Sequence, residues 1–377
     1  MTLLARERET LNALFPSLDE ALAALPLMQM EQPGNPAIPL FREHHGPSLL
    51  IPRDHGGKGA TPLQAMRVQT AIANRSPSLA VATTMHHFSV GTVVEMVQRK
   101  VGSGFEWMLL QGIAKNNLYV ASGFAEGRSG AGILNSSMKV ERTKEGLIIN
   151  GSKKPCSLSL SMNLLTASLV IPKDDGGIEL AIATIPAETP GIQRRPFWKS
   201  PILAGAESDE VILEQVSVPS MLVSYLGSPS QLDLIQARGF LWFELLISAS
   251  YLGVATALAE RCLKERKGSP GERVTLMSEL EGASAALEGI AAAMTDTAAN
   301  EDQLLARALF VRYAVQGAIE RASARSVELL GGMAFINSPE VSYLYSAARG
   351  LAFHPPSRTS ISTALDQHLY GEPLVIQ

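Results

Sequence analysis

Residues 239–259, GFLWFELLISASYLGVATALA, form the most apolar stretch of this 377-residue sequence. The stretch is nearly as long as a membrane-spanning helix, but Glu244 interrupts it, and a lone acid inside a bilayer is expensive. A helix buried on all sides within a large helical assembly accommodates the same pattern. The stretch therefore predicts a core helix and no membrane span, and it makes Glu244 the residue that needs an explanation.

The composition is typical of a helix-rich globular protein of two or three domains. Hydrophobic residues make up 46% of the chain and charged residues 18%, which provides enough apolar side chains for a substantial core. The net charge is −4 and the basic residues are scattered, so no nucleic-acid surface is expected. Cys156 and Cys262 stand far apart and the N-terminus is charged, so we expect a cytoplasmic protein with no metal site and no signal peptide.

The pattern along the chain changes twice. Helical spacing predicts helices over 62–74 and 79–100, and again over 240–265, 275–299 and 302–330. Between them, β-branched residues and turn signals predict strands at 118–123, 136–142, 146–150, 164–171, 179–185 and 210–216. Short strands at this spacing favour a small barrel or sandwich. The predicted domains are therefore 1–117 (helical), 118–228 (β) and 229–377 (helical).

Four separated motifs resemble those of the acyl-CoA dehydrogenase superfamily of flavoproteins. They are IPRDHGGKG at 51–59, LIINGSK at 147–153, AETPG at 187–191 and ELLGGMAF at 328–335. The resemblance extends over nearly the whole chain. It implies an α+β fold with an N-terminal helical domain, a central β-barrel domain and a C-terminal four-helix bundle. It also implies FAD as the cofactor and a homodimer or homotetramer, in which the double-glycine loop reaches a neighbouring subunit's cofactor.

The same resemblance implies which residues contact the flavin. The run YVASGFAEGRS at 119–129 matches the family's first flavin segment, and KKPCS at 153–157 matches the second, with Pro155 in place of the usual tryptophan. The expected cofactor-binding residues are Ala121, Ser122, Ser129, Ser157, Gly331 and Gly332. As alternatives, the serines are ordinary strand-end residues and the double glycine only ends a helix.

The expected general base departs from the family's usual position. The family's reaction removes an α-proton from a thioester, which requires a positioned carboxylate. Where most members carry a glutamate, this chain reads AFHPPS at 352–357, with His354 in the glutamate's place. In a minority of the family the base lies nine residues before a packing glycine, as Glu244 does before Gly253. We therefore predict Glu244 as the catalytic base and assign His354 and Phe353 to the substrate pocket; alternatively, Glu244 pairs with an arginine.

The displaced base resembles the carrier-protein aminoacyl oxidases of natural-product pathways, most closely the prolyl-carrier-protein dehydrogenases of cyanobacterial anatoxin-type biosynthesis. The resemblance implies oxidation of an L-prolyl thioester, held on an acyl or peptidyl carrier protein, to a dehydroprolyl thioester. Three alternatives stay open. They are an acyl-CoA dehydrogenase acting on a short branched acyl-CoA, a monooxygenase-like relative whose reduced flavin captures O₂, and a catalytically silent binding protein.

Overall fold

The computed structural model describes residues 3–101, 104–127, 136–173, 176–227, 234–296 and 298–376. The N-terminal helices are α1 (Ala5–Leu14), α2 (Leu18–Ala23), α3 (Leu27–Met30), α4 (Ala37–Glu43), α5 (Pro62–Arg75), α6 (Pro77–Gln98) and α7 (Glu106–Asn116). The strands are β1 (Val120–Gly123), β2 (Lys139–Arg142), β3 (Gly146–Cys156), β4 (Leu164–Pro172), β5 (Ile178–Pro186), β6 (Ile192–Arg195), β7 (Asp209–Pro219) and β8 (Val223–Gly227). The C-terminal helices are α8 (Leu234–Lys264), α9 (Pro270–Ala293), α10 (Glu301–Leu330), α11 (Gly332–Asn337), α12 (Pro339–Ala347), η5 (Ala348–Phe353) and α13 (Arg358–Leu369).

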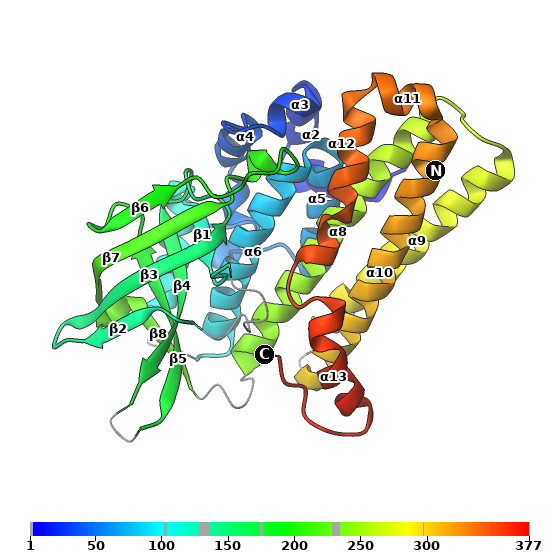
Figure 1. The fold of residues 1–377 in the computed structure, drawn as a ribbon. Helices are drawn as coiled ribbons and strands as arrows, with labels where there is room; N and C mark the ends of the chain where they lie inside the picture. The colour runs from blue at the N-terminus through cyan, green and yellow to red at the C-terminus, as the bar shows by residue number, and fades with distance from the viewer. Residues whose placement is uncertain are drawn as a thin grey trace.

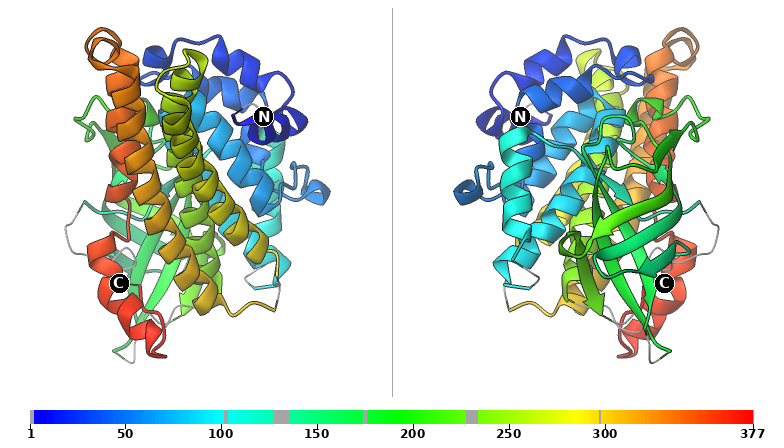
Figure 2. Two further views of the ribbon diagram at one scale, coloured as in Figure 1. Left: turned by 90° about the vertical axis from the view of Figure 1, so that its right-hand side faces the viewer. Right: turned by 90° about the vertical axis from the view of Figure 1, so that its left-hand side faces the viewer.

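The helices form one body and the strands lie against one side of it, next to α6 (Figure 1). Helices α9 and α10 lie on the opposite face, and α1 to α4 lie at one end (Figures 1 and 2). The α+β architecture with helical N- and C-terminal parts is therefore as predicted from the sequence. The division into three domains at the predicted boundaries stays a prediction.

The strands form two four-stranded sheets, in the orders β1-β4-β5-β8 and β2-β3-β7-β6. Strands β1 and β4 run parallel, and the other neighbours are antiparallel. A closed barrel needs a ladder that joins the two sheets, and none does so within the described ranges. The predicted barrel is therefore wrong. Edge strands β1, β2 and β6 span only four residues each, which leaves little backbone to pair across the gap.

Helix α8 contains the apolar stretch and lies at the centre of the helical body. It is buried without interruption from Ile235 to Ala259, and it packs on α5, α6, α9 and α10. At Gly253 a Cβ would lie 2.3 Å from the carbonyl oxygen of Thr70 on α5, so only glycine allows this close helix contact. By length and composition α8 could cross a membrane, but its most apolar window is entirely buried in the fold.

The bundle around α8 differs from the one expected. The C-terminal part contributes three long helices, α8, α9 and α10, while α5 and α6 come from the N-terminal part. Residues 229–377 also contribute the shorter α12, which packs on α8 and α10, so the helices around α8 come from both parts of the chain. Because α8 is apolar all round, it needs neighbours on every side, and the N-terminal helices provide them.

Candidate active site

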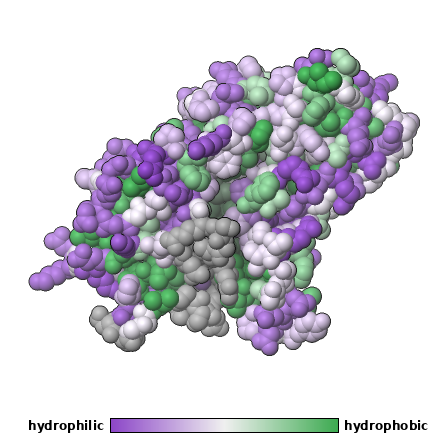
Figure 3. Space-filling view, in the orientation of Figure 1, coloured by the Kyte–Doolittle hydropathy of each residue, from purple (hydrophilic) through white to green (hydrophobic). Residues whose placement is uncertain are grey.

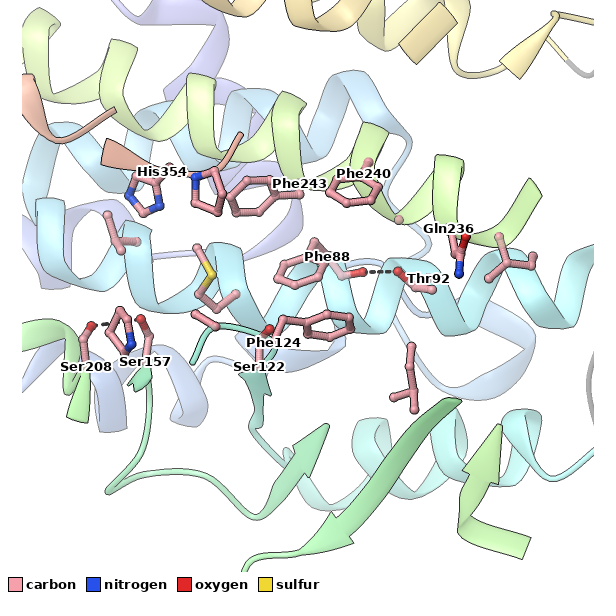
Figure 4. Close-up of a pocket in the computed structure, with 18 of the residues that line it drawn as sticks. Phe88, Thr92, Ser122, Phe124, Ser157, Ser208, Gln236, Phe240, Phe243 and His354 are labelled. Carbon is pink, nitrogen blue, oxygen red and sulfur yellow. Dashed lines mark hydrogen bonds between the residues drawn. The ribbon is translucent and has the colours of Figure 1, made fainter. Parts of the chain in front are cut away.

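The main cavity lies where the sheets meet α6 and α8 (Figure 4). Its walls come from these helices, the ends of β1 and β3, strands β5 and β8, and the loop after η5. The empty space between the walls is about 1100 Å³, its mouth included.

Aromatic rings form much of the cavity wall. The ring of Phe88 on α6 lies 5.4 Å from that of Phe243 on α8 and 6.0 Å from that of Phe124, which follows β1. Phe240 and Trp198 line the same cavity. The Phe88 contacts are edge-to-face, the arrangement that aromatic pairs prefer. Such walls exclude water and bind flat or alkyl groups by burial.

Three serines place hydroxyl groups on the wall opposite α8 (Figure 4). Ser122 belongs to β1, Ser157 directly follows β3, and Ser208 directly precedes β7. The hydroxyl oxygens of Ser157 and Ser208 lie 2.9 Å apart. Since a hydroxyl both donates and accepts, this wall offers hydrogen bonds without adding a charge.

His354 is the one titratable side chain on the described part of this wall. Its Nε2 atom lies 2.8 Å from the hydroxyl oxygen of Tyr251 on α8. Burial, with a smaller contribution from the nearby Arg312 cation, lowers the pKa of His354 to about 3, so the imidazole is neutral at physiological pH. Burial also raises the pKa of Tyr251, and its hydroxyl has no other hydrogen bond among the described residues. We therefore infer that Tyr251 donates to Nε2 and that His354 carries its own proton on Nδ1.

Three residues predicted from the sequence meet in this cavity, and Phe353 does not. Ser122, Ser157 and His354 all line it, whereas Ala121 is buried on β1 and is not part of the wall. The placement of Phe353 in the pocket is wrong, because its side chain is 83% exposed. The 3₁₀ helix η5 ends at Phe353. The Phe353 side chain therefore points to solvent, while that of the next residue, His354, points into the cavity.

The remaining predicted cofactor contacts lie elsewhere. Gly331 and Gly332 join α10 to α11, and Gly331 has a φ of 87°, which favours glycine at the end of a helix. Neither glycine lines this cavity, so their contact with a neighbouring subunit's cofactor stays a prediction. Ser129 lies outside the described residues.

Glu244 is buried in α8 and does not line the cavity. Its Oε2 atom lies 3.3 Å from Nε of Arg312 on α10, and Oε1 lies 3.5 Å from Nη1. Burial raises the pKa of Glu244 to about 7, and Arg312 opposes that rise. The structure thus has the alternative arrangement, in which the acid pairs with an arginine.

Sequence reasoning missed most of the cavity wall. Gln236, Phe240 and Phe243 recur at helical spacing on α8, but the helix is apolar all round, so this face does not stand out in the sequence. Trp198 and Ser208 come from the irregular stretch between β6 and β7, which carries no periodic signal.

Comparison with known proteins shows a relative that matches over the whole chain. The isobutylamine N-hydroxylase of Streptomyces viridifaciens is 45% identical over 372 residues, which cover 98% of each chain. The nitrososynthase of Micromonospora carbonacea var. africana has the same fold, with a TM-score of 0.85, 18% identity and 98% of each chain covered. FMN-bound TdsC from Paenibacillus sp. A11-2 also has this fold, with a TM-score of 0.81, 17% identity and 99% of each chain covered. No protein-family model matches the sequence.

These relatives overturn the reaction expected from the sequence. The full-length relative is an amine N-hydroxylase, and a dibenzothiophene monooxygenase of Rhodococcus erythropolis is 29% identical over 217 residues, 55% of this chain. Dehydrogenation of a carrier-bound prolyl thioester is therefore wrong, and the acyl-CoA dehydrogenase alternative gains no support. The predicted acyl-CoA dehydrogenase-like arrangement of helical and sheet parts agrees with the solved neighbours. The chain belongs to the same family as the isobutylamine N-hydroxylase of Streptomyces viridifaciens.

Proposed function

We propose that this protein is a flavin-dependent N-hydroxylase of small primary aliphatic amines. One atom of O₂ is transferred to the amine nitrogen to give a hydroxylamine, and the other leaves as water. A reduced flavin, when bound, supplies the two electrons that this division of O₂ requires. The observation that carries the proposal is the 45% identity to the isobutylamine N-hydroxylase over 98% of both chains.

The cavity residues fit a flavin. An isoalloxazine ring needs an apolar slot and a few hydrogen-bonding groups for its polar edge. The aromatic wall supplies the slot, and the hydroxyls of Ser122, Ser157 and Ser208 supply the hydrogen bonds. The FMN bound to TdsC in the same fold supports the same cofactor class.

The cavity also fits a neutral amine. No carboxylate lies on its described wall, so an ammonium ion would be buried there without a counter-charge, which is costly. Transfer of oxygen to nitrogen requires the lone pair, which only the neutral amine has. The rings of Phe88, Phe240 and Phe243 would hold the alkyl group through burial of its apolar surface.

His354 has the hydrogen-bonding properties that a residue next to the reacting oxygen and nitrogen atoms needs. Its neutral imidazole carries the Nδ1 proton and can donate a hydrogen bond to the oxygen atom that leaves as water. Tyr251 holds the ring from the side of α8. Exclusion of water by the aromatic wall favours oxygen transfer over the release of hydrogen peroxide.

The direct test supplies the purified protein with isobutylamine, O₂ and a flavin that a separate reductase keeps reduced. We expect N-isobutylhydroxylamine only when protein, reduced flavin and O₂ are all present. His354→Ala should lower its formation by about 10²- to 10³-fold, as loss of one hydrogen-bond donor beside a developing charge typically does. Phe353→Ala is the matched control, because this exposed neighbour should leave the rate unchanged. Hydrogen peroxide as the sole product with isobutylamine and other short amines would refute the proposal.

A further inference from the structure

A buried arginine holds the loop that carries His354. Arg312 lies in the middle of α10, and its side chain is 1% exposed. Its Nη1 donates to the carbonyl oxygen of Pro356 at 2.6 Å, and its Nη2 donates to those of Leu351 at 3.1 Å and His354 at 2.6 Å. Three carbonyls of one short loop therefore converge on a single guanidinium.

Glu244 provides the counter-charge for this guanidinium. An arginine side chain stays protonated in proteins, and a buried cation without a partner costs several kcal/mol. The Glu244 contacts, at 3.3 and 3.5 Å, are longer than two of the three carbonyl bonds by more than half an ångström. The short hydrogen bonds of Arg312 are thus directed to the loop carbonyls, and Glu244 balances its charge.

Two tyrosines hold the same loop. Tyr251 of α8 bonds the imidazole of His354, and the Tyr313 hydroxyl of α10 donates to the carbonyl oxygen of Pro356 at 2.9 Å. The ring of Phe243, which lines the cavity, lies 6.2 Å from the His354 ring. The loop backbone is therefore held by α10 and the imidazole by α8.

We propose that Arg312, with Glu244 as its counter-ion, is a positioning residue that fixes residues 351–356 so that His354 faces the cavity. An apolar pair of similar volume would pack α8 against α10 equally well, but it would remove the one partner that the His354 carbonyl has among the described residues, and one of the two donors to each of the Leu351 and Pro356 carbonyls. The inference rests on the proposed function only for what His354 does in the reaction, because the loop geometry is independent of it.

The first test separates positioning from general stability. Arg312→Lys keeps the charge but lacks the planar fork that reaches several acceptors at once. We expect kcat with isobutylamine to fall by about a hundredfold, the effect of misplacing a reacting group by an ångström. Arg238→Lys is the matched control, because Arg238 is also buried and bonds Glu95 at 3.0 Å and the Met294 carbonyl at 2.7 Å, away from this loop. It should change kcat by less than about twofold, as distant and independent sites do.

A double-mutant cycle shows whether Arg312 affects kcat through His354. If Arg312 acts through His354, Arg312→Lys lowers kcat in the wild-type background and adds almost nothing in the His354→Ala background. Equal losses in both backgrounds would show that Arg312 only stabilises the fold. Should Arg312→Lys fail to fold, Glu244→Gln, which keeps the volume and removes the charge, takes its place in the cycle.

NMR spectroscopy, which needs no enzymatic turnover, tests the positioning role separately from the proposed function. In protein labelled with ¹⁵N-histidine, His354→Ala identifies the ring signals of His354 among those of seven histidines. We expect Arg312→Lys and Glu244→Gln to shift these signals and Arg238→Lys to leave them in place. Unshifted His354 signals in both Arg312→Lys and Glu244→Gln would overturn the positioning role, even if the wild type hydroxylates amines. Shifted signals in a protein that hydroxylates no amine would support the positioning role and refute only the function.

Discussion

The hydrogen bond between Tyr251 and His354 sets the tautomer of the titratable side chain on the described cavity wall. Tyr251→Phe keeps the buried ring and removes the donor, which leaves Nε2 of His354 without its 2.8 Å partner. Loss of one partner of a buried hydrogen bond costs about 1–3 kcal/mol. We therefore expect hydroxylamine formation at saturating amine to fall by about tenfold, with more reduced flavin consumed for each product formed. An unchanged product-to-electron ratio in Tyr251→Phe would show that this bond does not orient His354.

At the same scale, the role of Glu244 shows where sequence reasoning stops. The sequence correctly singles it out as a buried acid in an apolar helix. What it cannot supply is the partner, because Arg312 lies 68 positions further along the chain and meets Glu244 only once α10 packs on α8. Ser122, Ser157 and His354 were identifiable because each stands in a short motif. Ser208 and Trp198 reach the cavity through tertiary folding alone.

At the scale of elements, α6 and the residue after β1 place a pair of aromatic rings between two cavities. A second cavity, with about 560 Å³ of empty space, shares Phe88, Thr92, Phe124 and Ile182 with the main one. The edge-to-face pair of Phe88 and Phe124 thus separates the two spaces. We infer that this partition limits the length of the alkyl chain that the main cavity accepts.

Phe124→Ala should join the two cavities and favour longer amines. One methylene in an apolar pocket is worth about 10- to 200-fold in kcat/KM, so we expect the preference for hexylamine over isobutylamine to rise at least tenfold. The measurement is kcat/KM for each amine, with Phe310→Ala as the control, because Phe310 is a half-exposed ring on α10 outside both cavities. An unchanged preference would mean that the partition does not border the substrate.

The helices and strands also show how much of the fold could be predicted from the sequence. The ranges expected for α5, α6, α8 and α10 agree with the structure to within a few residues, apart from the start of α8, because long apolar periodicities survive tertiary packing. Strands β6 and β8 are absent from the predicted strands, and β6 (Ile192–Arg195) carries only one apolar residue, which gives no alternating pattern. Barrel closure could not be judged, since it depends on pairing between strands distant in sequence.

For the whole molecule, three histidines make the fold sensitive to acid: His86 and His87 are buried, and His354 is half-buried. Burial lowers the pKa of His86 to about 4, that of His354 to about 3, and that of His87 well below its usual value. The unfolded chain binds protons at these sites from about pH 6.5 downwards, whereas the folded protein does not. Their contribution to stability is therefore complete above pH 6.5 and decreases as the pH falls towards 3.

We expect the unfolding temperature to fall steeply between pH 6.5 and 4. His87→Phe should reduce this pH dependence, because His87 is buried and its ring nitrogens have no hydrogen-bond partner in the described structure. Scanning calorimetry across this range measures both effects. His45→Phe is the control, since His45 lies on the surface and its change should leave the slope unaltered. A flat pH profile for the wild type would contradict the burial of neutral histidines.

The whole molecule also carries an apolar surface patch over α11 (Figure 3). Met333 is 69% exposed and Ile336 is 74% exposed, and exposed patches of this kind mark protein interfaces. We propose that this patch meets a second copy of the chain, consistent with the homodimer or homotetramer predicted from the sequence. Ile336→Glu combined with Met333→Glu should give a monomer in light-scattering measurements, while Leu160→Glu, an exposed apolar control away from α11, should not. A wild-type protein that is monomeric at every concentration would refute this proposal.

Transfer of one atom of O₂ to an amine nitrogen is the reaction proposed for this chain. The most direct measurement supplies isobutylamine, reduced flavin and ¹⁸O-labelled dioxygen to the purified protein and determines the mass of the product. We expect N-isobutylhydroxylamine that carries one labelled oxygen atom, formed at a much lower rate by His354→Ala. Hydroxylamine without the label, or all labelled oxygen recovered as hydrogen peroxide while the amine stays unchanged, would contradict it.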